Sequence, residues 1–260
     1  MQWIKILIGL AVLRASALQA QITTLRVAYD DFCPFTCVNA PQKGFLIDVL
    51  ERILEPKGFK LQTIEASWPR IKVMSKKGEL DLIPLLYRSE AKDLNILATD
   101  VSIGSSDIAL FVHKNSVWTY SGINSLAGQI IGILQDYTYP EPLSTLLNDP
   151  VSGKNQIIMA SEHGTERQIK MLASKRVSII PAQRMVFWYK AHKERKESLF
   201  REAGALSAPK GMENFYMGIA SKRQPLAQDL KKWIDQGVKE LNKSGEFQKI
   251  IETYGIPNSM

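Results

Sequence analysis

The sequence is poor in the residues that most often bind metals or perform covalent catalysis. Its 260 residues contain two cysteines, Cys33 and Cys37, and three histidines, His113, His163 and His192. The histidines are not close to the cysteines in sequence, and a structural zinc site usually needs four such ligands. His113 falls on a predicted strand and His192 on a charged helix, so catalysis of the Ser-His-Asp type has no support. We therefore expect no metal and no cofactor.

Long apolar runs are also missing. Residues 6–13 are apolar, follow Lys5 and precede the small-residue stretch ASALQAQ. This run is too short to span a bilayer, which needs about 20 residues, and no later segment is long enough. The pattern is typical of a secretory signal peptide over residues 1–20, cleaved after Ala20 or, as the alternative, after Ala17. We expect a mature chain in the periplasm.

Export decides how the two cysteines are interpreted. In an oxidising compartment Cys33 and Cys37 are expected to form a disulfide. Their C-x-x-x-C spacing is one residue longer than the C-x-x-C spacing of redox pairs. A ring this small contributes about 2 kcal/mol on the loop-entropy account, so it is expected to shape a loop more than to stabilise the whole fold.

The positive charge of the chain is spread among acids. The formal net charge is +7, and removal of Lys5 and Arg14 with the signal peptide leaves +5, because that segment holds no acid. The densest basic run, KAHKERKE at residues 190–197, alternates in sign at helical spacing and predicts a solvated helix face. No motif for nucleic-acid binding accompanies it, so no nucleic-acid partner is expected.

Strands and helices alternate along the chain. The apolar patterns predict strands and helices in one series from residue 24 to residue 114 and in a second from residue 129 to residue 221, followed by two C-terminal helices. In the second series a helix is predicted over residues 185–200. Such alternation favours an α/β fold with parallel strands joined by helical crossovers. Two units predict two lobes, with a ligand site in the cleft at the carboxyl ends of the strands.

The nonapeptide YDDFCPFTC, residues 29–37, follows the first predicted strand and would face this cleft. Asp31 and Phe32 are expected at the ligand site, whereas Phe35 is expected in the core. Pro34 and the disulfide would stiffen the loop and limit the entropy that is lost on ligand binding.

Five segments carry a resemblance to a known family. They are GFLIDVLERIL (44–54), SWPRIKVMSKKGELDLIP (67–84), SLAGQIIGILQDYTY (125–139), IKMLASKRVSIIPAQR (169–184) and MGIASKRQPLAQDLKKWIDQGVKELNKSGEFQKIIETYG (217–255). In this order they resemble the family 3 extracellular solute-binding proteins, the polar amino-acid binding type of bacterial ABC importers.

The resemblance implies a fold and a partner. The fold is the type II fold of periplasmic binding proteins, in which two lobes close about a hinge over a small ligand. Lobe 1 would combine residues 21–105 with 210–260, and lobe 2 would span residues 106–209. A monomer is expected, which binds a small molecule and docks on an ABC permease or a receptor in the inner membrane.

The resemblance also implies positions for ligand contacts in lobe 1. Phe32 and Trp68 correspond to aromatic walls on either side of the ligand, although Trp68 could instead be a core residue. Lys92 falls where the family places an arginine that pairs with the ligand carboxylate. Arg88, beside Tyr87, and Arg70 are the other candidates for this role.

In lobe 2 the resemblance points to two segments. Tyr137 and Thr138 align with residues that hydrogen-bond the ligand, next to Asp136 in place of the usual glycine. Gln183 stands where the family has an acid that meets the ligand ammonium. With basic candidates on one side and no acid on the other, the charges predict an anionic or neutral ligand.

Two other functions are compatible with this fold. An exported dehydratase would need a general acid, for which Asp31 and Glu162 are candidates. A sensory role would require docking to a separate receptor. A fused peptidoglycan-cleaving domain is not expected in a chain of this length.

Overall fold

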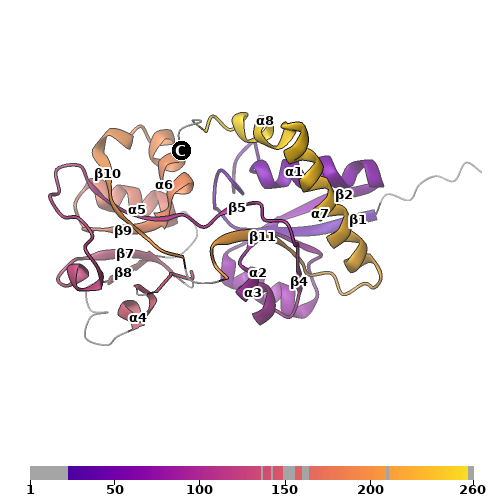
Figure 1. The fold of residues 1–260 in the computed structure, drawn as a ribbon, viewed down its shortest axis with the longest axis horizontal. Coiled ribbons are helices and arrows are strands. Elements are labelled where there is room, and N and C mark those ends of the chain that lie inside the picture. The colour runs from indigo at the N-terminus through magenta and orange to yellow at the C-terminus, as the bar shows by residue number, and fades with distance from the viewer. Residues whose placement is uncertain are drawn as a thin grey trace, which may run out of the picture.

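The computed structural model describes residues 23–135, 137–141, 143–148, 156–159, 164–208 and 211–256. The predicted signal peptide lies outside the described residues. The chain forms a mixed α/β structure with two bodies side by side (Figure 1). We call lobe 1 the body at the right of Figure 1 and lobe 2 the body at the left.

Lobe 1 is built on a sheet with the strand order β2-β1-β3-β11-β4, in which β5 also pairs with β11. Its strands are β1 (Thr23–Tyr29), β2 (Phe59–Glu65), β3 (Leu82–Leu86), β4 (Leu97–Ala98), β5 (Gly104–Ser105) and β11 (Asn214–Ile219). Its helices are α1 (Phe45–Leu54), α2 (Trp68–Lys77), α3 (Arg88–Asp93), α7 (Leu226–Ser244) and α8 (Glu246–Glu252).

Both faces of this sheet are covered. Val27 and Tyr29 pack into one core with α1, α7 and α8, whereas Ala28 packs into another with Trp68 and Ile71 of α2. Figure 1 shows the two helical layers on opposite sides of the strands. Because successive strand residues point to opposite faces, β1 contributes to both cores.

Lobe 2 holds two smaller sheets, one ordered β10-β6-β9 and one formed by β7 and β8. Its strands are β6 (Ile108–His113), β7 (Ile131–Leu134), β8 (Gln156–Met159), β9 (Ile180–Gln183) and β10 (Phe200–Leu206), and its helices are α4 (Leu143–Asn148), α5 (Gly164–Ala173) and α6 (Arg184–Lys193). A bridge from Ile131 to Ile179 joins the two sheets. The chain therefore enters lobe 2 between β5 and β6 and returns between β10 and β11.

Strand directions correct part of the sequence prediction. The pairs β1–β2, β1–β3 and β7–β8 are parallel, as expected for helical crossovers. However, β11 runs antiparallel to β3, and β6 runs antiparallel to both β9 and β10. The antiparallel pairs contain β6 and β11, the first strands after the two passages between the lobes. Among the described residues, no helix lies between β5 and β6 or between β10 and β11.

The helix predicted over residues 185–200 is too long. It ends at Lys193, Arg195 has a φ of 54°, and β10 begins at Phe200. A left-handed backbone stops a helix, and the small or apolar residues that follow are needed in the sheet, where Ala203 and Leu206 are buried. Strand β10 was not predicted, nor were the short elements α3, β4 and β5.

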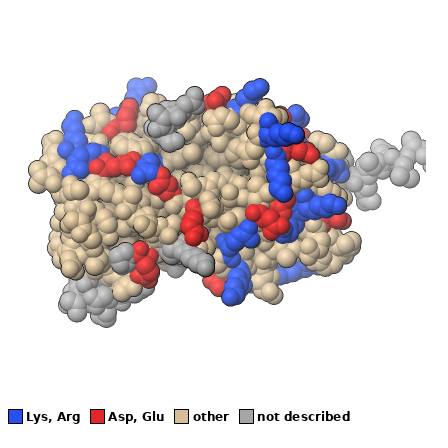
Figure 2. All heavy atoms as spheres, viewed as in Figure 1, with Lys and Arg blue, Asp and Glu red and all other residues tan. Residues whose placement is uncertain are grey.

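Charged side chains of both signs are interspersed over the two lobes on the face in Figure 2. Many of the basic side chains on this face lie over lobe 1, at the right. The run at residues 190–197 is not a fully solvated face, because Lys190 is buried.

The first amides of α1 hold the loop that follows β1. Phe45 N donates to Pro34 O at 3.0 Å and Leu46 N donates to Phe35 O at 3.1 Å. These are helix N-terminal amides that have no partner inside the helix. A disulfide joins Cys33 and Cys37 across this loop, and Phe35 is buried in the lobe 1 core. The loop is thus fixed by the helix and by its own covalent ring.

Gly44, which precedes α1, is the residue that allows this approach. Its φ is 104°, and a Cβ there would lie 2.4 Å from both Phe35 O and Thr36 Cα. We expect Gly44→Ala to lower the free energy of unfolding by roughly 3 kcal/mol, because backbone strain adds to a clash with the loop. Urea denaturation followed by tryptophan fluorescence would measure the loss.

Gly58 provides the matched control, since its φ is 82° and nothing lies within 4 Å of its added Cβ. Gly58→Ala should cost only about 1 kcal/mol, for the left-handed backbone alone. Equal losses in the two variants would show that the close approach of loop and helix contributes nothing.

Candidate functional site

A cavity of about 80 Å³ lies where the two lobes meet. Lobe 1 contributes side chains from the loop after β1, from α2, β3, α3 and the residue before α3, and from β11. Lobe 2 contributes side chains from β6, β7, residues 137–139, β9, α5 and α6. The lining residues are Asp30, Phe32, Trp68, Leu85, Tyr87, Glu90, Ile108, Leu134, Tyr137, Thr138, Tyr139, Thr165, Gln168, Pro181, Ala182, Gln183, Val186 and Phe215. A largely apolar wall with a few polar groups is typical of a small-molecule site.

The structure brings six of the sequence-predicted site residues together in this wall: Phe32, Trp68, Tyr87, Tyr137, Thr138 and Gln183. The ring of Phe32 lies 6.4 Å from that of Tyr137, across the gap between the lobes, and 6.0 Å from that of Phe215. Trp68 is 8% exposed and packs in an apolar cluster of lobe 1, so it serves the core as well as the wall.

The structure places none of the three basic candidates in the wall of this cavity. Arg70 and Lys92 are exposed. The Arg88 guanidinium lies over the Tyr216 ring at 4.0 Å and donates to Asp100 O at 3.1 Å. For Arg70 the reason is helical geometry. It lies two residues after Trp68 on α2, a rotation of about 200°, so its side chain points away from the side on which Trp68 is buried.

Gln183 lines the cavity, but its amide is engaged elsewhere. Its Oε1 accepts from Val186 N at 2.8 Å, which caps the start of α6, and its Nε2 donates to Ser105 O at 3.5 Å. This side chain therefore supports the passage between lobes more than it offers an acceptor to a ligand.

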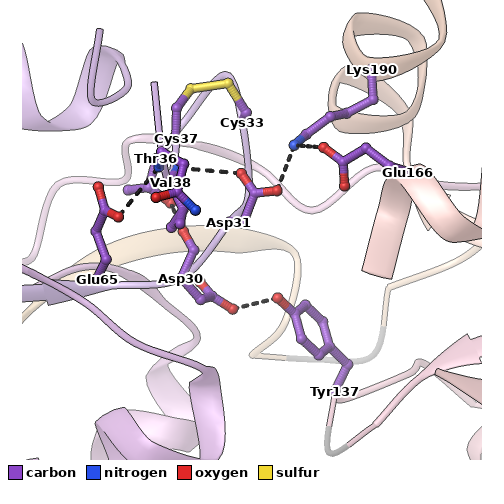
Figure 3. A network of polar contacts seen from close by, with 11 residues as sticks. Asp30, Asp31, Cys33, Thr36, Cys37, Val38, Glu65, Tyr137, Glu166 and Lys190 are labelled. Carbon is purple, nitrogen blue, oxygen red and sulfur yellow. Dashed lines mark hydrogen bonds and ion pairs between the residues drawn. A yellow bond between two sulfur atoms is a disulfide. The ribbon is translucent and has the colours of Figure 1, made fainter. Parts of the chain in front are cut away.

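An aspartate that the sequence analysis passed over lies at the centre of the contact between lobes. Asp30, the residue after β1, accepts a hydrogen bond from the Tyr137 hydroxyl of lobe 2 (Figure 3). Burial raises the pKa of Asp30 to about 6, and the hydrogen bond from Tyr137 only partly opposes that effect. Burial, together with the nearby Asp30 charge, also raises the pKa of Tyr137.

Glu90 makes a second contact of the same kind. Its Oε1 accepts from the Thr138 hydroxyl at 3.2 Å, and its Oε2 accepts from Tyr87 N at 2.9 Å at the start of α3. Burial raises the pKa of Glu90, and the charge of Asp30 acts in the same direction. Two acids of lobe 1 thus face two neighbouring hydroxyls of lobe 2.

A buried ion pair forms the third contact between the lobes. Lys190 Nζ on α6 lies 2.5 Å from Asp31 Oδ2 of lobe 1 and also pairs with Glu166 of α5 (Figure 3). Burial alone would lower the pKa of Lys190, but the two carboxylates outweigh it and raise the pKa. Asp31 is therefore placed beside the cavity and not in its wall.

Sequence reasoning missed Asp30 and Glu90, and each had a signal. Asp30 directly follows a strand whose carboxyl end was expected at the cleft. Glu90 stands three residues after Tyr87, the spacing of an N-terminal capping box, but α3 itself was not predicted. Thr165 and Gln168, also missed, are buried polar residues of α5, and Gln168 Nε2 donates to Gly132 O at 3.1 Å within lobe 2.

Two further features were sought among the described residues, a metal site and a membrane-spanning helix. Within the described ranges, no group of three or more His, Cys, Asp or Glu side chains could hold a metal ion. Of the helices in the same ranges, none combines the length and apolar character that a membrane span requires. Asp136 and Glu162 lie outside the described residues.

A cavity walled by two lobes, with side chains of one lobe bonded to those of the other, is typical of proteins that close over a small ligand. Residues 25–257 match the sequence profile of the bacterial extracellular solute-binding proteins, family 3. The chain belongs to this family. A comparison with curated proteins finds no significant match.

Solved structures confirm the fold. An amino acid ABC transporter substrate-binding protein from Streptococcus pneumoniae, bound to L-arginine, is 20% identical, with 89% of this chain and 93% of that chain covered and a TM-score of 0.68. An ancestral arginine-binding protein bound to arginine is 18% identical, with 89% and 97% covered and a TM-score of 0.69. A histidine kinase sensor domain with similarity to periplasmic binding proteins is 16% identical, with 90% and 96% covered and a TM-score of 0.68.

The raised pKa of Asp30 predicts a pH effect on stability. Because folding moves this pKa from 3.8 to about 6, the folded state holds the proton more tightly, and the contribution of Asp30 to stability falls as the pH rises through that window. Asp30→Asn cannot ionise. Relative to the parent protein, it should gain stability between about pH 4 and about pH 7, by up to about 3 kcal/mol.

Urea denaturation of both proteins across this pH range would measure the difference. Tyr137→Phe, which removes the hydrogen bond to Asp30 but keeps the acid, should retain a pH dependence in the same direction. A difference between Asp30→Asn and the parent that stays flat with pH would contradict an Asp30 that is buried and hard to ionise.

The buried ion pair predicts a second effect. Lys190→Met would leave Asp31 and Glu166 without their cation, which should lower the free energy of unfolding by about 3 kcal/mol. It should also increase the radius of gyration in X-ray scattering, because one contact between lobes is lost. Lys193→Met, on the exposed side of the same helix, should change stability by less than about 0.5 kcal/mol. If Lys190→Met and Lys193→Met had the same free energy of unfolding and the same radius of gyration, the ion pair would not hold the lobes.

Proposed function

We propose that this protein captures a small solute between its lobes in the periplasm and presents it, in the closed form, to a transporter in the inner membrane. Lobe 1 would comprise residues 21–105 and 210–260, and lobe 2 would comprise residues 106–209. Residues near 105 and 210 would then form the hinge. Family membership supports ligand binding, and the position of the cavity supports closure as the mechanism.

The observation that carries this proposal is the composition of the cavity wall. It takes side chains from both lobes, and the Asp30–Tyr137 and Glu90–Thr138 hydrogen bonds connect the lobes at its edge. A solute bound in the cavity would contact both lobes at once. Its affinity for the closed form would therefore exceed that for the open form, which is the requirement for ligand-driven closure.

A receptor is the second candidate partner, since one similar structure is a histidine kinase sensor domain. The two partners differ in their consequence for the cell. With a transporter, deletion of the gene should abolish uptake of the radiolabelled solute that the purified protein binds. With a receptor, uptake should persist and only the response to the solute should be lost.

Catalysis is not part of the proposal. The family binds solutes, and the candidate acid Asp31 is held in an ion pair with Lys190.

Replacing the aromatic wall should separate binding from folding. In a panel of L-amino acids, amines and dicarboxylates, we expect at least one solute to raise the melting temperature and reduce the radius of gyration. Trp68→Ala should weaken the binding of that solute by at least about tenfold, because the wall loses apolar contact area. Calorimetric titration would give both affinities.

Trp233→Ala is the control. Trp233 packs on Phe59 at 5.7 Å between ring centroids, is partly buried and does not line the cavity. This variant should lose stability but keep its affinity for the solute. The proposal would be overturned if no solute in the panel binds and the protein, purified without refolding, carries no small molecule in native mass spectrometry.

A further inference from the structure

The charges in the cavity wall are all of one sign. Among the described residues that line the cavity, Asp30 and Glu90 carry carboxylates and none is lysine, arginine or histidine. The chain is positive overall, but the charged side chains among the described residues of its cavity wall are all acidic. The basic side chains that the sequence offered, Arg70, Arg88 and Lys92, lie outside the wall.

The nearest basic side chains do not neutralise these acids. Lys72 is close enough to lower the pKa of Glu90, but its ammonium lies 6.0 Å from the centre of the Trp68 ring and it does not line the cavity. The effect of burial outweighs it, and the pKa of Glu90 is raised. Lys190 is committed to Asp31 and Glu166. Asp30 and Glu90 are left with uncharged partners, which are the hydroxyls of Tyr137 and Thr138 and, for Glu90, the Tyr87 amide.

Aromatic rings share the cavity wall with the two acids. The cavity wall includes the rings of Phe32, Trp68, Tyr87, Tyr137, Tyr139 and Phe215. The face of an aromatic ring attracts a cation, most strongly where water is excluded. Carboxylates at the edge of such a wall supply the opposite charge that a buried cation requires.

We propose that the natural ligand of this cleft is an organic cation without a carboxylate, an amine or a guanidinium compound, held between Asp30 and Glu90 against the aromatic wall. This inference rests on the proposed function and specifies its ligand. It replaces the anionic or neutral ligand that the sequence predicted. The cation takes over the two carboxylates from the hydroxyls of Tyr137 and Thr138 and joins the lobes by charge.

The two acids also argue against an α-amino acid. A ligand carboxylate about 5 Å from one of them would be repelled, at an effective dielectric constant near 20, by an energy worth a few hundredfold in affinity. An amine should therefore bind much more tightly than the amino acid from which it differs only by the carboxylate.

Matched ligand pairs test this directly. The full mature chain would be titrated in a calorimeter with agmatine and L-arginine, with cadaverine and L-lysine, and with tyramine and L-tyrosine, at low salt and near pH 7.5. We expect at least one amine to bind about tenfold more tightly than its parent amino acid, or better. Equal or tighter binding of every amino acid, preference for succinate, or no binding of any amine would overturn the inference.

Variants of the acids provide the second arm. Asp30→Asn with Glu90→Gln keeps the shapes and the hydrogen-bond acceptors, and it should weaken amine binding by about tenfold or more. Glu79→Gln with Asp93→Asn removes two exposed acids of lobe 1, changes the net charge equally, and should leave the affinity unchanged. Equal loss in both double variants would reduce the effect to long-range charge and overturn the assignment.

The outcomes separate this inference from the function on which it rests. Tight binding of an amino acid or a dicarboxylate, with lobe closure in X-ray scattering, would overturn the cationic ligand and leave the solute-binding function intact. Only a protein that binds nothing across the wider panel, and that carries no solute when purified, would overturn both.

Discussion

The contact between lobes depends on carboxylates that are withdrawn from water at the end of one strand. Asp30 and Asp31 follow β1, and both reach across to lobe 2, one to Tyr137 and one to Lys190 (Figure 3). Burial of a charged group is costly unless it is paired or hydrogen-bonded. Asp31 meets a cation, whereas Asp30 meets only a phenol. The lobes are therefore held together by the paired charge of Asp31. The charge of Asp30 has no cationic partner among the described residues, and a ligand can still supply one.

The loop around Cys33 and Cys37 gives these two acids their direction. Its residues bond to the first amides of α1, and the Thr36 hydroxyl donates to Asp30 O at 2.9 Å. A flexible loop would have to be ordered whenever the lobes close, and that entropy would be subtracted from ligand affinity. Here the disulfide, the helix start and the buried Phe35 ring supply the order in advance. The covalent ring thus acts on the site by way of the loop.

The sequence predicted the architecture better than the chemistry. Apolar periodicity located most helices and strands, because each buries a face with a regular spacing, as in the pairing of Val27 and Tyr29 on one side of β1 and Ala28 on the other. It missed α3, β4 and β5, which are too short to show a period, and β10, whose sequence FREAGAL lacks a regular apolar alternation. It also extended the helix that ends at Lys193, because a left-handed turn at Arg195 leaves no mark on hydrophobic patterning.

At the cavity, the structure places the predicted aromatic residues in the wall and the predicted basic residues outside it. Phe32 and Trp68 lie in the wall, and large rings tend to be found where apolar area is needed. Long basic side chains carry no such constraint, since a lysine or arginine can extend its charge into water from almost any position. Arg70 and Lys92, both exposed, do so, and the charged groups in the cavity wall are Asp30 and Glu90. Charge summed along a sequence therefore says little about a cleft, because Asp30 and Glu90 are held there by hydrogen bonds from Tyr137 and Thr138, whereas long basic side chains can turn away.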